Sequence, residues 1–370
     1  MRKIVYAITF LFSYILVLVG QTNKNKYFRY FCFSVGIVIP SLIAAFRDYT
    51  VGTDVLVYGN PVFFASRKVS DFSSLVMYYE KSGIEKGYLG MNYLVSKFTD
   101  SPQLLYFFIE MIILIYVVLS IKKFNSFYNV GYAFPYLCYM LLFYGENLNM
   151  MRQSIAVAIS VFVFFSILEK HYFIAIINFI FGFLFHRSIV VVIIIYFLYL
   201  FFEKNKYKSL SLILSIIGVL LVSISFNSLA TLLTGYELFS KYTMYTNDIS
   251  ESVLRLNGLI IRIVFLAPIL LYRKKFFRSS NNSYFLLFIL IAEIIVFQLS
   301  TINSVFYRIS SYFSIFKIFI YPYLCYLPSL KLDQRILKIV LIIVLIVIWV
   351  YQNVIQGNNE IFPYKFVGLL

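Results

Sequence analysis

The chain has 370 residues, of which 61% are hydrophobic and only 13% are charged, and its mean hydropathy is +0.86. A soluble domain is nearer half apolar and a quarter charged, so this composition predicts a protein whose solvent is a lipid bilayer. The net charge of +16 does not indicate nucleic-acid binding, because the lysines and arginines lie in short clusters between apolar runs, as a membrane topology signal does.

About twelve apolar runs are long enough, or nearly so, to cross a bilayer as helices. Three runs, 132–144, 172–185 and 188–202, are short for about 30 Å of hydrocarbon, and the last two either cross twice or form a hairpin that dips into the membrane. Because the sequence contains no repeat or linker, we predict an all-α, polytopic transmembrane helical bundle in one domain, residues 1–370. In chain order the runs cover residues 4–19, 31–46, 104–121, 132–144, 149–168, 172–185, 188–202, 210–226, 256–272, 284–299, 309–327 and 336–351.

Alternate short loops between these runs carry sixteen basic and three acidic residues, so we predict that they are cytoplasmic. Both termini and the two long loops, 47–103 and 227–255, then lie outside the cytoplasm. The loop 47–103 holds six acidic and six basic residues and a plausible amphipathic helix at 71–82, which indicates a folded segment that contains loop helices.

Two polar motifs in the first long loop could bind an anionic head group. Arg47 directly follows the second run, and Gly52, Asp54 and Tyr58 come after it. An arginine at a helix end, a glycine that permits close backbone approach and an aspartate suit such a ligand. The alternatives are an arginine that extends to the membrane interface and a simple turn. Glu85 is a second candidate, or a solvated carboxylate.

Two further motifs lie on the same predicted side. Asn149 is predicted to cap a helix whose first turn holds Arg152 and Gln153, so that free N–H groups, the helix dipole and a guanidinium converge. The alternative is an interfacial arginine that touches lipid phosphate. His186 and Ser188 lie between two short helices, where the imidazole could act as a general base or hydrogen-bond donor, or be structural.

Several charges lie at or within the apolar runs. Intramembrane charges are costly, so they indicate either a functional cavity or two structural ion pairs. Arg255 and Arg262 are seven residues apart and share a helix face. Arg308, with Tyr312 after it, starts a helix on the outer side. The deep charges are Glu110, Arg262, Glu293 and Lys317.

Cofactor motifs are missing. The two histidines and three cysteines form no zinc pattern, and there is no glycine-rich phosphate loop and no Asp-x-Asp pair. We therefore expect no metal and no cofactor.

Taken together, the motifs resemble those of the EpsG family of polysaccharide-biosynthesis membrane proteins, which is similar to the Wzy class of repeat-unit polymerases. The resemblance extends with most detail from Arg47 to Tyr199, and over the last third by hydropathy alone. Arg187 departs from a family motif that often reads His-Lys-Ser, but it keeps the charge. The motifs that carry the resemblance are Arg47 with Val51-Gly52-Thr53-Asp54 and Tyr58, Glu85-Lys86-Gly87-Tyr88, Asn149-Met150-Met151-Arg152-Gln153-Ser154-Ile155-Ala156, Phe185-His186-Arg187-Ser188, and Arg308 with Tyr312.

The resemblance implies a bacterial inner-membrane glycosyltransferase that polymerises lipid-linked repeat units into capsule, O-antigen or exopolysaccharide. A glycan on polyprenyl diphosphate would be the donor, and the terminal sugar of a second lipid-linked unit would supply the attacking hydroxyl. Partners would be this oligosaccharide lipid, membrane lipid, and a chain-length regulator and a flippase. The candidate bases are Asp54, His186 and Glu85, in that order; the candidate substrate-binding residues are Arg47, Gly52, Tyr58, Asn149, Arg152, Gln153, Ser188, Arg255, Arg262, Arg308 and Tyr312.

Two other functions remain open from the sequence. A transporter or flippase of the same lipid-linked sugars would also need cations in a cavity, and the charges at Arg262, Glu293 and Lys317 favour it. It should have two pseudo-symmetric halves, which the sequence does not show. A membrane O-acyltransferase would need a histidine placed for acyl transfer.

Overall fold

The structure, a computed structural model, describes residues 2–224, 256–301 and 303–368. These residues are helical, with one isolated bridge between Arg47 and Phe366 and no strand. They form two compact units, Met1–Ile189 with Ile336–Leu370 (unit 1) and Val190–Arg335 (unit 2). The all-helical fold is confirmed, and the single domain stays a prediction. The second long loop and Arg255 lie outside the described residues.

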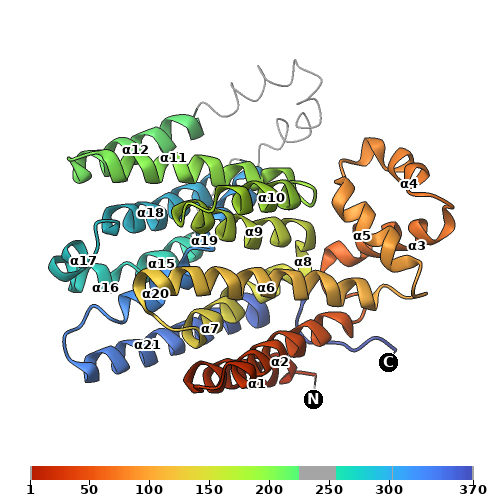
Figure 1. The fold of residues 1–370 in the computed structure, drawn as a ribbon, viewed down its shortest axis with the longest axis horizontal. Helices are drawn as coiled ribbons and strands as arrows, with labels where there is room; N and C mark the ends of the chain where they lie inside the picture. Colours follow the sequence, from red (N-terminus) through yellow and green to blue (C-terminus); the bar gives the residue numbers. More distant parts are fainter. Residues whose placement is uncertain (1, 225–255, 302, 369–370) are drawn as a thin grey trace. The chain divides into compact units, whose positions relative to one another are not determined.

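Unit 1 contains most of the long apolar helices (Figure 1). Two π-helical turns and three 3-10 turns interrupt or extend them: η1 (Val55–Gly59), η2 (Glu80–Ser82), η3 (Arg187–Val190), η5 (Val350–Ile355) and η6 (Asn358–Glu360). The α-helices are α1 (Val5–Thr22), α2 (Lys26–Ala45), α3 (Asn60–Lys68), α4 (Phe72–Tyr78), α5 (Lys86–Ser96), α6 (Gln103–Tyr128), α7 (Ala133–Leu142), α8 (Tyr144–Asn149), α9 (Met151–Leu168), α10 (Tyr172–Phe183) and α21 (Lys331–Trp349).

Unit 2 consists of shorter helices. Its predicted runs 256–272 and 309–327 are each broken into two helices, at residues 265–266 and 315–316. The helices are α11 (Val191–Lys204), α12 (Lys208–Ile224), α15 (Leu256–Val264), α16 (Ala267–Leu271), α17 (Arg273–Ser279), α18 (Ser283–Leu299), α19 (Val305–Ser314) and α20 (Lys317–Leu324).

The predicted number of about twelve membrane-crossing helices is not confirmed. Among the described residues five helices are long and apolar enough to cross a membrane, or six if the pair Leu256–Leu271 and Arg273–Ser279, bent by 82°, counts as one span. Over the described residues every predicted run contains helix, but four of the helices, such as α7 and α10, are apolar and shorter than a span. Most of the other runs form helices shorter than a span, and the runs 256–272 and 309–327 are broken in the middle.

A proline inside α2 explains how α1, α2 and α7 are joined. Pro40 has no N–H, so the carbonyl of Gly36, one turn earlier, loses its helical partner. The hydroxyl groups of Ser13 in α1 and Tyr136 in α7 donate to that carbonyl, the latter at 2.9 Å. In an apolar solvent a free carbonyl is costly, so these bonds fix the three helices together.

The first long loop folds into helices, as predicted. Figure 1 shows these helices beside the N-terminal end of α6. The expected helix at 71–82 is present as α4 followed by η2. Asp71 starts α4, where its carboxylate accepts a hydrogen bond from the backbone N–H of Ser74 at 2.9 Å.

The C-terminal segment (residues 357–368) pairs with the start of the same loop. The N–H of Asp48 donates to Lys365 O at 2.8 Å, and the Thr53 hydroxyl donates to a Glu360 carboxylate oxygen at 2.7 Å. The Tyr6 hydroxyl, near the start of α1, donates to Ile361 O at 2.9 Å. The start of α1 and residues 357–368 therefore lie beside this loop; on which side of the membrane they lie stays a prediction.

Gly52 allows the loop to pass directly over α8. Its φ is +89°, and a Cβ atom there would lie 2.4 Å from the carbonyl oxygen of Leu148. We predict that Gly52→Ala lowers the free energy of unfolding by about 2–4 kcal/mol, because a strained backbone and a backbone clash add together.

Thermal unfolding of the purified protein in detergent measures this effect. Gly218→Ala in α12 is the control, because apart from the adjacent helix backbone no atom of the described residues lies within 4 Å of a Cβ there, and it should leave stability unchanged or raise it slightly. Equal effects of the two substitutions would contradict the role of the close contact.

Candidate functional site

The candidate site is built on the junction between α8 and α9. Met150, with φ −92° and ψ 56°, separates the two helices and stands at the N-cap position of α9. The prediction that Asn149 caps α9 is wrong, because residues 144–149 form a helix of their own and the break falls one residue later. The side-chain oxygen of Asn149 instead accepts a hydrogen bond from the backbone N–H of Asp54 at 3.3 Å.

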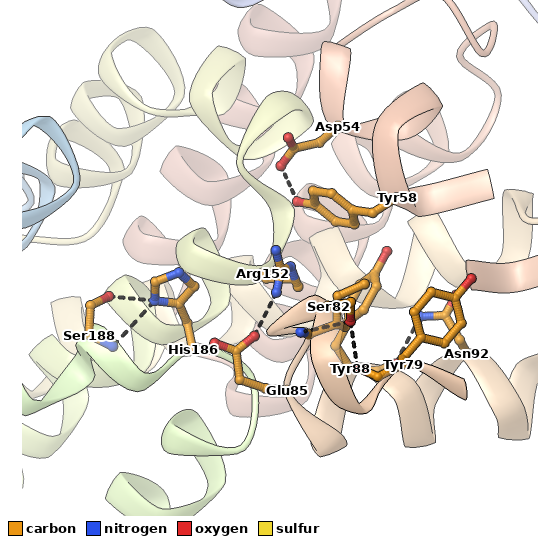
Figure 2. Close-up of polar contacts among 11 residues, drawn as sticks. Asp54, Tyr58, Tyr79, Ser82, Glu85, Tyr88, Asn92, Arg152, His186 and Ser188 are labelled. Atoms are coloured by element: carbon orange, nitrogen blue, oxygen red, sulfur yellow. Dashed lines mark hydrogen bonds and ion pairs between the residues drawn. The ribbon is translucent and has the colours of Figure 1, made fainter. Parts of the chain in front are cut away.

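Arg152 lies in the first turn of α9, as predicted, and its guanidinium is the centre of the side chains drawn in Figure 2. Its Nη1 atom is 2.7 Å from an oxygen of Glu85, and Cζ is 4.4 Å from the ring centre of Tyr58 and 5.9 Å from that of Tyr88. The Nε atom is buried and has no hydrogen-bond partner among the described residues. The side chain is 20% exposed, so a ligand can reach it.

Asp54 and Tyr58 stand above this guanidinium in Figure 2. Asp54 begins the π-helical turn η1, which brings Tyr58, four residues later, onto the same side, and the Tyr58 hydroxyl donates to the Asp54 carboxylate. Burial, and secondly the Asp54 charge, raise the pKa of Tyr58 well above its usual value. The phenol therefore stays protonated and remains a donor at any physiological pH.

The turn that holds His186 and Ser188 is tied to the start of α5. The N–H of Gly87 donates to Leu184 O at 2.8 Å, and a Cβ at Gly87 would lie 2.6 Å from that same oxygen. Only glycine permits this approach. Gly87 thus lets the start of α5, which carries Glu85, lie directly against the turn that carries His186.

The tautomer of His186 follows from its contacts. The backbone N–H of Ser188 donates to Nδ1 at 3.3 Å, and the Ser188 hydroxyl lies 2.5 Å from the same nitrogen. A backbone N–H can only donate, so Nδ1 is an acceptor and the neutral ring carries its proton on Nε2. In this geometry Nε2 is the donor nitrogen of the neutral ring.

Arg47 is placed next to the site but is inside the protein. It is 1% exposed, with Nη1 2.8 Å from Leu148 O, Nη2 3.1 Å from the sulfur of Met151 and Cζ 4.8 Å from the ring centre of Tyr106. Gln153 is likewise buried, at 4% exposed. Neither side chain is open to a ligand in this structure, and their predicted binding roles stay untested.

The remaining predicted residues belong to unit 2. Arg308 is exposed at the start of α19, and Tyr312 is fully buried. The Arg262 Nε and Lys317 Nζ atoms contact the same oxygen of Glu293, at 2.7 and 2.8 Å. Three of the four deep charges therefore form one cluster, and not the two ion pairs considered from the sequence.

The fourth deep charge, Glu110, is in unit 1. It is 1% exposed and accepts a hydrogen bond from the side-chain amide of Asn147 in α8 at 3.0 Å.

Two residues that support the site, Tyr88 and Glu360, are not among the predicted site residues. The ring of Tyr88 is fully buried against that of Tyr58, with centroids 5.6 Å apart. Its place in the Glu85-Lys86-Gly87-Tyr88 motif was a usable signal. Glu360 accepts a hydrogen bond from Thr53, the neighbour of Asp54, and no pattern near residue 360 indicates this.

Among the described residues no group of three or more His, Cys, Asp or Glu could hold a metal ion; the expected absence of a metal stays a prediction.

The fold and this group of side chains define an all-helical membrane protein with a polar site at one end of its long helices. The EpsG family model matches residues 29–366, and the chain belongs to that family, one of exopolysaccharide-related membrane proteins. Comparisons with curated proteins and with solved structures find no match.

We predict that Arg47→Lys lowers the free energy of unfolding by about 2–3 kcal/mol. A lysine ammonium cannot reproduce the fork that contacts both Leu148 and Met151, and it would be a poorly paired buried charge. Thermal unfolding measures the change. Arg67→Lys, at an exposed ion pair with Asp100, is the matched control and should cost less than about 1 kcal/mol. An Arg47→Lys protein as stable as wild type would show that the guanidinium contacts are dispensable.

Proposed function

We propose that the protein is a polysaccharide repeat-unit polymerase. It transfers a glycan from polyprenyl diphosphate to the terminal sugar of a second lipid-linked repeat unit, on the extracytoplasmic face of the bacterial inner membrane. The observation that carries this proposal is the Arg152 guanidinium, partly open at the start of α9 and grouped with Asp54, Tyr58 and Glu85. Membership of the EpsG family supports it.

The reaction explains why such a group would be needed. An acceptor hydroxyl oxygen forms a bond to the anomeric carbon of the donor glycan, and the bond from that carbon to the diphosphate oxygen breaks. The diphosphate leaves on its polyprenyl chain with additional negative charge. A guanidinium at a helix N-terminus stabilises that charge, because the free N–H groups and the helix dipole act in the same direction.

The proton of the acceptor hydroxyl needs a base, and Asp54 is the first candidate. The hydrogen bonds from the Tyr58 hydroxyl to its carboxylate and from its own N–H to Asn149 fix its orientation. Glu85 is already engaged with Arg152, which makes it a weaker candidate. The His186 ring, with its proton on Nε2, would donate a hydrogen bond to a sugar or phosphate oxygen.

The other predicted residues take supporting roles in this proposal. Arg47 and Gly52 act as positioning residues, because both contact the backbone of Leu148 at the end of α8. Arg308, which is exposed, stays a candidate for binding lipid phosphate or glycan. Arg255, Arg262 and Tyr312 keep the roles proposed from the sequence, as do the chain-length regulator and flippase as partners.

The rival function is a flippase of the same lipid-linked sugars. Of the deep charges that favoured it, Arg262 and Lys317 both contact the Glu293 carboxylate, so each cation already has an anionic partner inside the protein. We therefore favour the polymerase.

We predict that Arg152→Ala abolishes long polymer in cells while single lipid-linked units accumulate on the outer face of the membrane. Loss of an arginine that stabilises transition-state charge typically lowers the rate by about 10²–10³-fold. Glycan length on gels, at matched membrane expression, measures the effect, with Arg67→Ala as the control. Units trapped on the cytoplasmic face would indicate a flippase, and unchanged polymer would remove Arg152 from the mechanism.

We predict that His186→Gln retains more polymerising activity than His186→Asn, by about tenfold or more. The glutamine amide can place an N–H near the position of Nε2, whereas asparagine resembles the Nδ1 side of the ring. Polymer yield at matched expression compares the two. Equal and complete loss in both would contradict a donor role at Nε2, and greater activity in His186→Asn would place the function at Nδ1.

A further inference from the structure

The contact between Arg152 and Glu85 couples the site to the helices of the first long loop. Nη1 of Arg152 is 2.7 Å from a Glu85 oxygen, and the two side chains are 20% and 9% exposed. Glu85 stands at the N-cap position of α5, yet its side chain makes no capping hydrogen bond there. The carboxylate instead contacts the cation on which the proposed function depends.

In a membrane, the contact between Glu85 and Arg152 competes with the phosphate groups of the surrounding lipids. A bilayer presents a great excess of phosphodiester head groups, each with one negative charge, and an arginine at the interface readily binds them. Arg152 without a counter-ion would therefore be occupied by ordinary phospholipid. The Glu85 carboxylate already contacts the Arg152 guanidinium, so a phosphate ligand must displace this carboxylate in order to bind there.

Replacement favours a ligand with more than one charge. A phosphodiester would exchange one anionic contact for another and would leave Glu85 largely buried without its partner, which is costly. A diphosphate brings a second oxyanion and therefore a stronger charge-assisted contact with the guanidinium, whose Nε has no hydrogen-bond partner among the described residues. The displaced carboxylate remains at the N-terminus of α5, where the helix dipole favours a negative charge.

We propose that Glu85 is a specificity-determining residue, whose carboxylate competes for Arg152 and so excludes singly charged phosphodiester lipids while it admits diphosphate-linked lipids. This inference rests on the proposed function, because it assumes that Arg152 binds the diphosphate of the substrate. It differs from a role of Glu85 as base, which would affect turnover and leave the choice of lipid unchanged.

The test compares two probes that differ by one phosphate: glucosyl polyprenyl diphosphate and glucosyl polyprenyl phosphate. Dissociation constants are measured on the purified protein in nanodiscs of neutral lipid. We expect wild type to favour the diphosphate and Glu85→Gln to bind the monophosphate more tightly, so that the ratio of the two constants falls by about tenfold or more. An unchanged ratio in Glu85→Gln would overturn the inference.

Three variants sharpen the comparison. Glu80→Gln removes the same charge from an exposed position of the same loop and should leave the ratio at its wild-type value. Glu85→Asp keeps the charge and should preserve most of the selectivity. In Arg152→Ala, adding Glu85→Gln should change the ratio no further, because the cation that the carboxylate guards is absent; a further tenfold fall there would count against the mechanism.

A measurement on wild type alone covers the case in which Glu85→Gln does not fold. Phosphatidylglycerol is raised from none to half of the nanodisc lipid, and the affinity for the diphosphate probe should stay within about twofold. A steep loss of affinity would overturn the inference. Failure of the proposed function is distinguishable: wild type would bind neither probe, or Arg152→Ala would bind the diphosphate as tightly as wild type does.

Discussion

The hydrogen bond from the Arg47 guanidinium to the Leu148 carbonyl is the interaction on which the arrangement of the site depends. A helix that ends inside an apolar bundle leaves carbonyl groups without partners, and no water in the hydrocarbon can replace them. Arg47 supplies a charged donor to the end of α8, and Gly52 lets the next stretch of chain pass over the same carbonyl. The chain can therefore break at Met150 and restart as α9 with Arg152 in its first turn.

The short helix α8 is fixed to the rest of unit 1 by hydrogen bonds from its side chains. Tyr144 donates to the carbonyl of Pro40 in α2 at 2.7 Å, and Asn147 is hydrogen bonded to both Glu110 and Tyr139. These bonds form inside the bundle, where an unpaired polar group would be costly, so they fix the position of α8 firmly. The residue at its end, Asn149, then sets the position of Asp54.

The sequence predicted the parts of this site that depend on local pattern. Apolar runs identified the helices, and the position of Arg152 followed from the start of the fifth run. The pairings could not be predicted in the same way, because they join residues far apart: 101 positions separate Arg47 from Leu148, and 67 separate Glu85 from Arg152. For Arg47 the sequence indicated an anion, but the two Nη atoms contact a backbone carbonyl and a sulfur instead, while the buried Nε has no hydrogen-bond partner among the described residues.

The pairing of Thr53 with Glu360 has a consequence for the order in which the protein is made. The two residues are 307 positions apart, so the loop that carries Asp54 emerges from the ribosome long before the segment that holds it. During that interval α1, α2 and α9 can already be inserted and packed, while the stretch around Asp54 lacks its contacts with residues 360–367. The site therefore reaches its final geometry only after the C-terminal segment is synthesised, and a nascent chain does not present a finished site to lipid substrates.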